Sequence, residues 1–128
     1  MRDDDALLAL RPHIDTQPGA LPAEAFQNAT LRPILKLQHG RLIAAWHRYA
    51  HRNKGTFYRL NRPAQRDFIR HALQTNRELR SFLLGLVCGV MTEGEWVAFR
   101  QNERELARRV YALAADRLVG AAESYARP

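Results

Sequence analysis

The sequence predicts an all-α fold, a single-domain bundle of four main helices in which the C-terminal helix is long. Apolar residues recur at helical spacing through most of the chain, and no segment alternates apolar and polar residues as a half-buried strand would. At 128 residues, 46% of them hydrophobic, the chain is large enough for one hydrophobic core and too apolar for a disordered protein. We expect at least about 60% helix, roughly twice the average share in globular proteins.

The N-terminal region differs from the rest of the chain. Residues 1–21 are interpreted as a flexible N-terminal arm and residues 22–128 as the helical bundle domain. The arm contains two prolines and a glycine between residues 12 and 19, which interrupt regular structure. It leaves room for at most a short helical turn over residues 5–11.

The first helix of the domain is expected over residues 22–51. Proline suits its first turn, because the N–H that proline lacks would have no partner there. The apolar residues that share one face of this segment are Leu31, Ile34, Leu35, Leu42, Ala45, Trp46 and Tyr49. Pro33 interrupts the pattern and leaves two alternatives. Either Thr30 caps a new helix with Pro33 in its first turn, or one helix continues and is kinked at Pro33.

Two more helices are expected after a basic loop over residues 53–62. Gly55 is suited to end the preceding helix in a left-handed conformation. The next helix is expected from about residue 63 to 74 and the following one from 77 to 91. The apolar stripe of the latter consists of Leu79, Phe82, Leu83, Leu86, Val87 and Val90.

The longest helix is expected over residues 92–127, a stretch without proline. Thr92 and Glu95 match a capping box, in which each side chain bonds a free backbone N–H of the first turn. At 1.5 Å per residue the helix would span about 50 Å. Helical spacing unites its apolar residues into one stripe, formed by Trp96, Phe99, Leu106, Val110, Leu113, Leu118 and Tyr125.

A carboxylate falls in the centre of this stripe. Glu103 lies between Phe99 and Leu106, so we expect its side chain to be buried and paired. If the helix packs on the 22–51 helix, a polar cluster forms from Glu103, Asn102, Gln38, His39 and Asn28. We favour a structural network that fixes how the two helices pack. The alternative is a small-ligand pocket, or an enzyme site, with a perturbed carboxylate.

The chain contains no motif typical of a catalytic or metal site. It has no glycine-rich phosphate loop, nucleophile elbow or Cys/His cluster, so we assign no catalytic residue and expect no cofactor. His47 and His51 are one helical turn apart, a spacing that can bind a metal ion, but no third ligand is apparent. We interpret both as solvated surface histidines. Cys88, the one cysteine, lies in an apolar run and is interpreted as part of the core.

The positive charge of the chain is concentrated in its middle. The formal net charge is +7, and residues 41–80 contain ten of the twenty Lys and Arg but only two acidic residues. This balance suggests an acidic partner. Aromatic residues are interleaved with the basic ones, the combination that single-stranded nucleic acid sites use for phosphates and bases. The candidate nucleic-acid-binding residues are Arg48, Arg52, Lys54, Arg59, Arg62 and Arg66. The simpler interpretation, which we favour, is that the rings cover the core and the arginines are solvated.

One stretch resembles a known family. Residues 26–39, FQNATLRPILKLQH, resemble the signature of a family of small uncharacterised bacterial proteins that share a TLRPILKLQ-type motif. Residues 94–102 are similar to a later stretch of the same family, and the resemblance would cover about residues 22–125. It implies a helical fold and no established activity. Some members are labelled glyoxalases, but this chain has neither the strands nor the metal ligands of that enzyme class.

These patterns favour a protein that acts by binding. Our first expectation is contact with another protein, most simply in a homodimer, because a bundle of this size would leave the ends of the 92–127 helix uncovered. The alternative is a nucleic-acid-binding module that uses residues 41–80. The longest apolar run, residues 82–91, is too short to cross a bilayer. The acidic N-terminus also differs from a signal peptide, so we expect a cytoplasmic protein without membrane contact.

Overall fold

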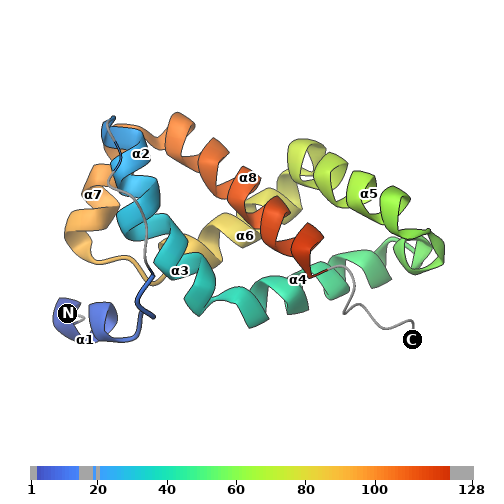
Figure 1. Ribbon diagram of the computed structural model, residues 1–128, viewed down its shortest axis with the longest axis horizontal. Helices are drawn as coiled ribbons and strands as arrows, with labels where there is room; N and C mark the ends of the chain where they lie inside the picture. Colours follow the sequence, from blue (N-terminus) through green and yellow to red (C-terminus); the bar gives the residue numbers. More distant parts are fainter. Residues whose placement is uncertain (1–2, 15–18, 20, 122–128) are drawn as a thin grey trace.

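The computed structural model describes residues 3–14, 19 and 21–121 (Figure 1). The fold is all-α, as predicted: it is 82% helical, and no strand occurs among the described residues. The elements in chain order are α1 (Asp4–Ala9), α2 (Pro22–Phe26), a π-turn (Gln27–Leu31), α3 (Arg32–Leu37), α4 (His39–Arg52), a 3-10 turn (Thr56–Arg59), α5 (Arg62–Thr75), α6 (Arg77–Cys88), α7 (Glu93–Gln101) and α8 (Glu103–Gly120).

The helix continues through Pro33, as in the second alternative, and Pro33 lies in the first turn of α3, as in the first. Pro33 cannot donate a backbone hydrogen bond, and its ring crowds the carbonyl four residues before it. The π-turn relieves this crowding, since the N–H of Arg32 donates to the carbonyl of Gln27, five residues back. Thr30 is buried within the π-turn and caps nothing. A break that the sequence did not predict lies at Gln38, where α3 ends and α4 begins.

Helices α5 and α6 lie close to their expected positions. Asn61 and Asn76 cap them, each accepting a hydrogen bond from the backbone N–H three residues later. Gly55 has a φ of 65°, the left-handed conformation that glycine adopts at little cost. The loop before α5 therefore forms where Gly55 predicts it.

The prediction of one long C-terminal helix is wrong, because the chain breaks at Asn102 into two helices, α7 and α8. The capping box of Thr92 and Glu95 is present and begins α7. Six polar residues follow Phe99 before Leu106, so no apolar contact holds a straight helix through this stretch. Phe99 and Leu106 are both buried, on helices that point in different directions. Residues 122–127 of the expected helix, with Tyr125, lie outside the described part of the chain.

The core is built around α8. Figure 1 shows α8 crossing the molecule between α3 and α5, and it also packs on α4, α6 and α7. Its buried residues run from Leu106 to Leu118, which covers most of its length. On the other side of the core, the buried ring of Trp46 meets Phe57 edge to face, with ring centroids 5.1 Å apart. The four longest helices, α4, α5, α6 and α8, thus form the body that was expected as a four-helix bundle.

The side chain of Arg11 ties the N-terminal arm to this body. The arm contains a short helix, α1, as expected, which Asp3 caps. Beyond α1, the guanidinium of Arg11 donates two hydrogen bonds of 2.5 Å to the carboxylate of Glu95 and one of 3.1 Å to the carbonyl of Val90. The side chains of Arg11 and Glu95 are only 7% and 17% exposed. Residues 15–18, which include Pro18, are outside the described part of the chain.

Candidate functional site

The expected burial of Glu103 is wrong. Its side chain is 55% exposed and forms an ion pair of 3.2 Å with Arg100, which is also exposed. The cause is the helix break at Asn102. Glu103 begins α8, so it no longer follows the face of α7 that buries Phe99. Asn102 is exposed as well, and neither residue supports a buried ligand pocket.

The other members of the predicted polar cluster lie between the π-turn and the start of α4. Gln38 Nε2 donates to the carbonyl of Leu86, at 2.9 Å. Asn28 Oδ1 accepts from Arg32 Nε at 3.1 Å, and His39 Nδ1 lies 3.4 Å from Arg117 Nη1. Neither Gln38 nor His39 has a hydrogen bond or ion pair with Asn102 or Glu103 in the described chain.

The predicted cluster does not form, and the polar contacts that join these elements to α8 are made by arginines. Arg109 Nη1 donates to Gln27 Oε1 at 2.9 Å, and Arg109 Nε donates to Glu105 Oε1 at 3.0 Å. Arg117 makes the contact with His39 two turns further along α8. Burial lowers the pKa of Arg117, and the nearby charge of Arg32 lowers it further.

The predicted nucleic-acid residues of the basic segment lie on several elements, and all six side chains are exposed. Phe57 and Tyr58 are buried, so these rings cover the core as the simpler interpretation predicted. Arg48 and Arg52 line a hollow of about 200 Å³ between α4 and α6, beside Tyr49 and Phe82. The remaining four are Lys54 and Arg59, in the connection after α4, and Arg62 and Arg66, at the start of α5.

His47 differs from its predicted role as a solvated histidine. Its Nδ1 forms a short hydrogen bond with the hydroxyl of Tyr58, and the two rings are stacked with centroids 5.7 Å apart. Burial lowers the pKa of His47, and the neighbouring His51 lowers it further. His51 is exposed, as expected. Among the described residues, no group of three potential ligands could hold a metal ion.

Sequence reasoning missed a second cationic site, although two of its arginines, Arg70 and Arg80, belong to the basic segment 41–80. Two adjoining hollows, of about 390 Å³ and 600 Å³, lie where α8 faces the end of α5 and the start of α6. Both are lined by Arg80, Arg108 and Tyr111, while Arg70 lines the first and Arg104 the second. We call the surface formed by these five residues the arginine groove.

A stacked pair lies at the centre of the arginine groove. The guanidinium of Arg80 lies over the ring of Tyr111, 4.2 Å from its centroid, in a cation–π contact. Arg80 Nη1 also donates weakly to the carbonyl of Gln74, at 3.4 Å, whereas its Nε is buried without a hydrogen-bond partner. The groove thus contains a planar cation that is held in place by a ring and a backbone carbonyl.

Two of the other arginines in the groove have carboxylate partners at its edge. Arg70 Nη1 pairs with Asp116 Oδ1 at 3.0 Å, and Arg108 pairs closely with Glu105. Hydrogen bonds from Arg108 and Arg109 lower the pKa of Glu105. Arg104 has no ion pair within the described chain. The groove therefore contains four guanidiniums and two carboxylates, and its net charge is positive.

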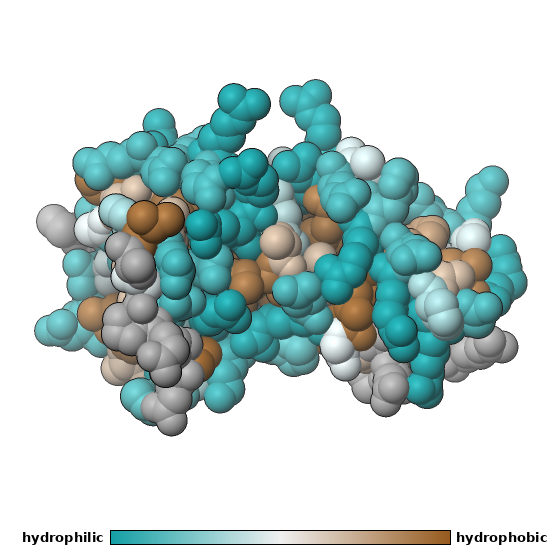
Figure 2. All heavy atoms as spheres, turned by 45° about the horizontal axis from the view of Figure 1, so that its top comes forward, coloured by the Kyte–Doolittle hydropathy of each residue, from teal (hydrophilic) through white to brown (hydrophobic). Residues whose placement is uncertain are grey.

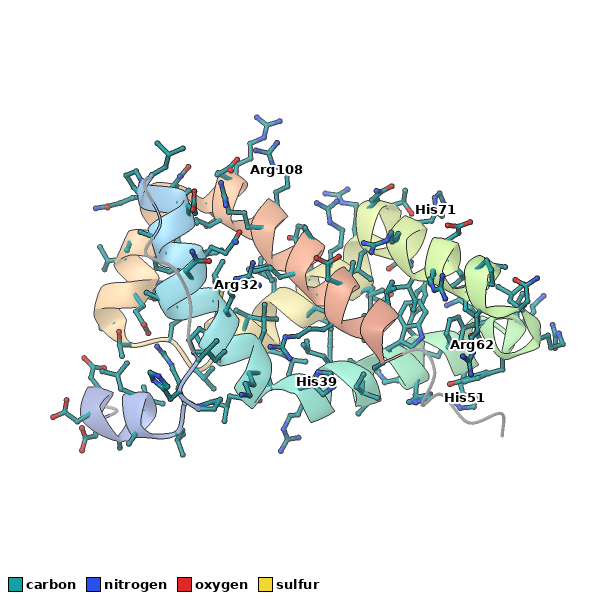
Figure 3. The ribbon with its side chains drawn as sticks, viewed as in Figure 1. Arg32, His39, His51, Arg62, His71 and Arg108 are labelled. Atoms are coloured by element: carbon teal, nitrogen blue, oxygen red, sulfur yellow. The ribbon has the colours of Figure 1, made fainter. Side chains whose placement is uncertain are left out.

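Figures 2 and 3 show the surroundings of the arginine groove. In Figure 3, Arg108 projects outward from the first half of α8. Figure 2 shows hydrophilic side chains on both sides of a hollow in the middle of the molecule, where apolar residues reach the surface. Arg104, Arg108 and Tyr111 are three or four positions apart, which places them on one side of α8. This spacing is visible in the sequence, but it lies outside residues 41–80, where the basic residues are concentrated.

Comparison with known proteins gives no relatives. No protein-family model matches the chain, and neither a curated protein nor a solved structure is similar to it. The family resemblance over residues 26–39 therefore stays a prediction. In the described chain, no helix combines the length and the apolar character that crossing a membrane requires.

Proposed function

We propose that this protein binds single-stranded nucleic acid through the arginine groove, in the cytoplasm. The observation that carries the proposal is the stack of Arg80 on Tyr111 among three more arginines from α5 and α8. Guanidinium groups bind phosphate with two parallel hydrogen bonds, and every base has a flat face that stacks on a planar group.

The proposed roles follow from the geometry of each side chain. The guanidinium of Arg80 covers the ring of Tyr111, and this stack is the flat element of the groove beside which a base packs. Arg104 and Arg108 lie one turn apart on α8 and contact successive phosphates. Arg70, already paired with Asp116, contributes charge at the far end of the groove.

A nucleic acid fits this groove better than an acidic peptide. Carboxylates of a peptide would use the arginines but would leave the flat Arg80–Tyr111 stack without a planar partner. The groove is open along its length, since two hollows join at Arg80 and Arg108, which suits an extended strand. The proposal moves the site away from the six basic residues predicted from sequence, none of which lines the groove.

Titration of a fluorescently labelled single-stranded RNA or DNA, followed by anisotropy, tests the proposal. The groove variant Arg80→Gln, Arg104→Gln, Arg108→Gln is compared with the control Lys54→Gln, Arg59→Gln, Arg66→Gln, which loses the same charge at exposed positions. We expect the groove variant to bind at least about 10-fold more weakly and the control to change by less than about 3-fold, because phosphate contacts are local. Equal losses in both variants, or no binding by the parent protein, would refute the proposal.

Self-association is a second candidate, favoured by exposed apolar side chains on α7. Trp96 and Val97 are 36% and 51% exposed, although they are neighbours on a short helix. The uncovered ends of a 92–127 helix no longer argue for a homodimer, because that helix is divided and α8 is covered along most of its length. Light scattering of the parent and of Val97→Asp decides this candidate: a dimer that the substitution dissociates supports it, and a monomeric parent rejects it.

A further inference from the structure

Another hollow lies on the other side of α6 from the arginine groove. Glu78 and Phe82 are four positions apart on α6 and line the hollow between α4 and α6 described above. Arg80, which belongs to the groove, is two positions from each of them, and at about 100° per residue this places it on roughly the opposite side of the helix. We call this space the α4–α6 hollow. What it binds does not depend on the function proposed for the groove.

The buried residues of the α4–α6 hollow are apolar. Ala45 of α4 and Leu79 of α6 line it and are 8% and 5% exposed. Two rings also line it, that of the half-buried Tyr49 and that of Phe82, which is 46% exposed. The hollow measures about 200 Å³, and pockets for drug-sized ligands measure about 300–1,000 Å³. It therefore suits a small ligand with an apolar body, of the size of one ring.

Two guanidiniums of α4 line the same hollow. Arg48 and Arg52 are four positions apart, which places them on one side of the helix. Cζ of Arg48 lies 5.6 Å from the centroid of the Phe82 ring, in a cation–π contact that holds the guanidinium beside the apolar residues. Arg48 has no ion pair within the described chain. Its charge is therefore available to an anion that enters the hollow.

One carboxylate of α6 lies opposite the guanidiniums. Glu78 Oε1 is 3.6 Å from Arg52 Nη1, and both side chains are highly exposed, so this ion pair is weak and can open for a ligand. Asn53 and Asn76 also line the hollow, but the side chain of each already has a hydrogen bond to a backbone group. Two guanidiniums and one carboxylate leave the hollow with a single net positive charge.

We propose that the α4–α6 hollow binds a small monocarboxylate whose apolar body contains one ring. The carboxylate accepts hydrogen bonds from Arg48 and Arg52, because a guanidinium presents parallel donors that match its two oxygens. The ring of the ligand packs on Leu79 beside Tyr49 and Phe82. The single positive charge matches one carboxylate. A phosphate group fits less well, since Glu78 repels its second charge and the apolar residues would have no partner.

A titration with phenylacetate, followed through the amide NMR signals of the protein, tests the inference. Two matched probes are added under the same pH and ionic strength: phenylethanol, which has the ring without the carboxylate, and acetate, which has the carboxylate without the ring. We expect saturable shifts around the hollow with phenylacetate, and at least about 10-fold weaker binding of the other two, because hydrogen bonds to a charged group exceed a factor of ten in affinity. Inorganic phosphate or an oligonucleotide that saturates the same signals at lower concentration than phenylacetate would overturn the inference and assign the hollow to phosphate.

Three variants make the result specific to the site. Arg48→Gln should weaken phenylacetate binding at least about 10-fold, and Arg48→Lys, which keeps the charge without the planar fork, should lie between it and the parent. The control Arg66→Gln removes the same charge at an exposed position outside the hollow, and we expect a change of less than about 2-fold because solvent and salt screen it. The inference is also overturned if phenylacetate gives no saturable shift, if acetate or phenylethanol binds as tightly, or if Arg48→Gln, shown to be folded by its amide spectrum, binds like the parent.

Discussion

Arg11 and Glu95 form the contact that docks the N-terminal arm, and we predict strong energetic coupling between them. Replacing Glu95 by Gln keeps an oxygen for the capping box but removes the charge that pairs with a 7% exposed guanidinium. Breaking one side of a buried ion pair costs about 3–5 kcal/mol when the other charge stays buried. Here Arg11 belongs to a terminal arm that can move into water, so we expect a smaller loss of about 2–3 kcal/mol, the value of hydrogen bonds to charged groups.

A double-mutant cycle measures this coupling. The free energy of unfolding is determined by urea titration for the parent, Arg11→Gln, Glu95→Gln and the double variant. Once either charge is removed the arm is released, so the second substitution should add little, and we expect a coupling energy of about 2 kcal/mol. The exposed pair Arg100–Glu103 is the matched control, for which we expect about 0–1 kcal/mol. A coupling at Arg11–Glu95 no larger than at the control would refute a docked arm.

Three further predictions follow from single side chains. Burial raises the pKa of Glu95, but the hydrogen bonds and charge of Arg11 and the N–H of Thr92 outweigh it, so the net pKa is lowered. The ion pair therefore stabilises the fold at neutral pH, and this stabilisation is lost as pH falls through the lowered pKa. In thermal melts the parent should lose more stability in acid than Glu95→Gln does, and parallel pH profiles would contradict this. Burial and the charge of Glu103 raise the pKa of the Cys88 thiol to about 11, so Cys88 should react with a thiol reagent much more slowly at pH 7 than after unfolding, and equal rates would show an accessible thiolate. Tyr58→Phe removes the hydroxyl that bonds His47 and should destabilise the protein by about 0.5–1.5 kcal/mol in urea titration, with an unchanged midpoint counting against that bond.

Local signals in the sequence located the elements that depend on neighbouring residues. Thr92 and Glu95 form the predicted capping box, and Asn76 caps α6, because each needs only residues three positions away. The break at Asn102 was not predictable in this way. The polar run from Arg100 to Glu105 is compatible with a continuous helix or with a break, and only the tertiary structure decides between them.

The candidate sites show the same limit. Glu103 was placed in an apolar stripe that exists only if the helix is continuous, so the burial prediction failed together with the helix. The arginine groove joins Arg80 of α6 to Arg108 of α8, which lie 28 positions apart in the sequence and meet only in the folded chain. Charge density along the sequence finds where cations are frequent, whereas a site depends on which helices the core brings together.

The salt dependence of oligonucleotide binding tests the central claim most directly. Each phosphate that an arginine neutralises releases counterions, which gives a slope of log K against log salt of about −0.7 per contact on a single strand. Phosphate contacts of Arg70, Arg104 and Arg108 predict a slope of about −2 for the parent protein. Replacing Arg80, Arg104 and Arg108 by Gln removes two of these contacts and should make the slope shallower by about 1.4, while replacing Lys54, Arg59 and Arg66 should leave it nearly unchanged. The opposite pattern, a parent-like slope in the groove variant and a shallow one in the control, would contradict the arginine groove as the nucleic-acid site.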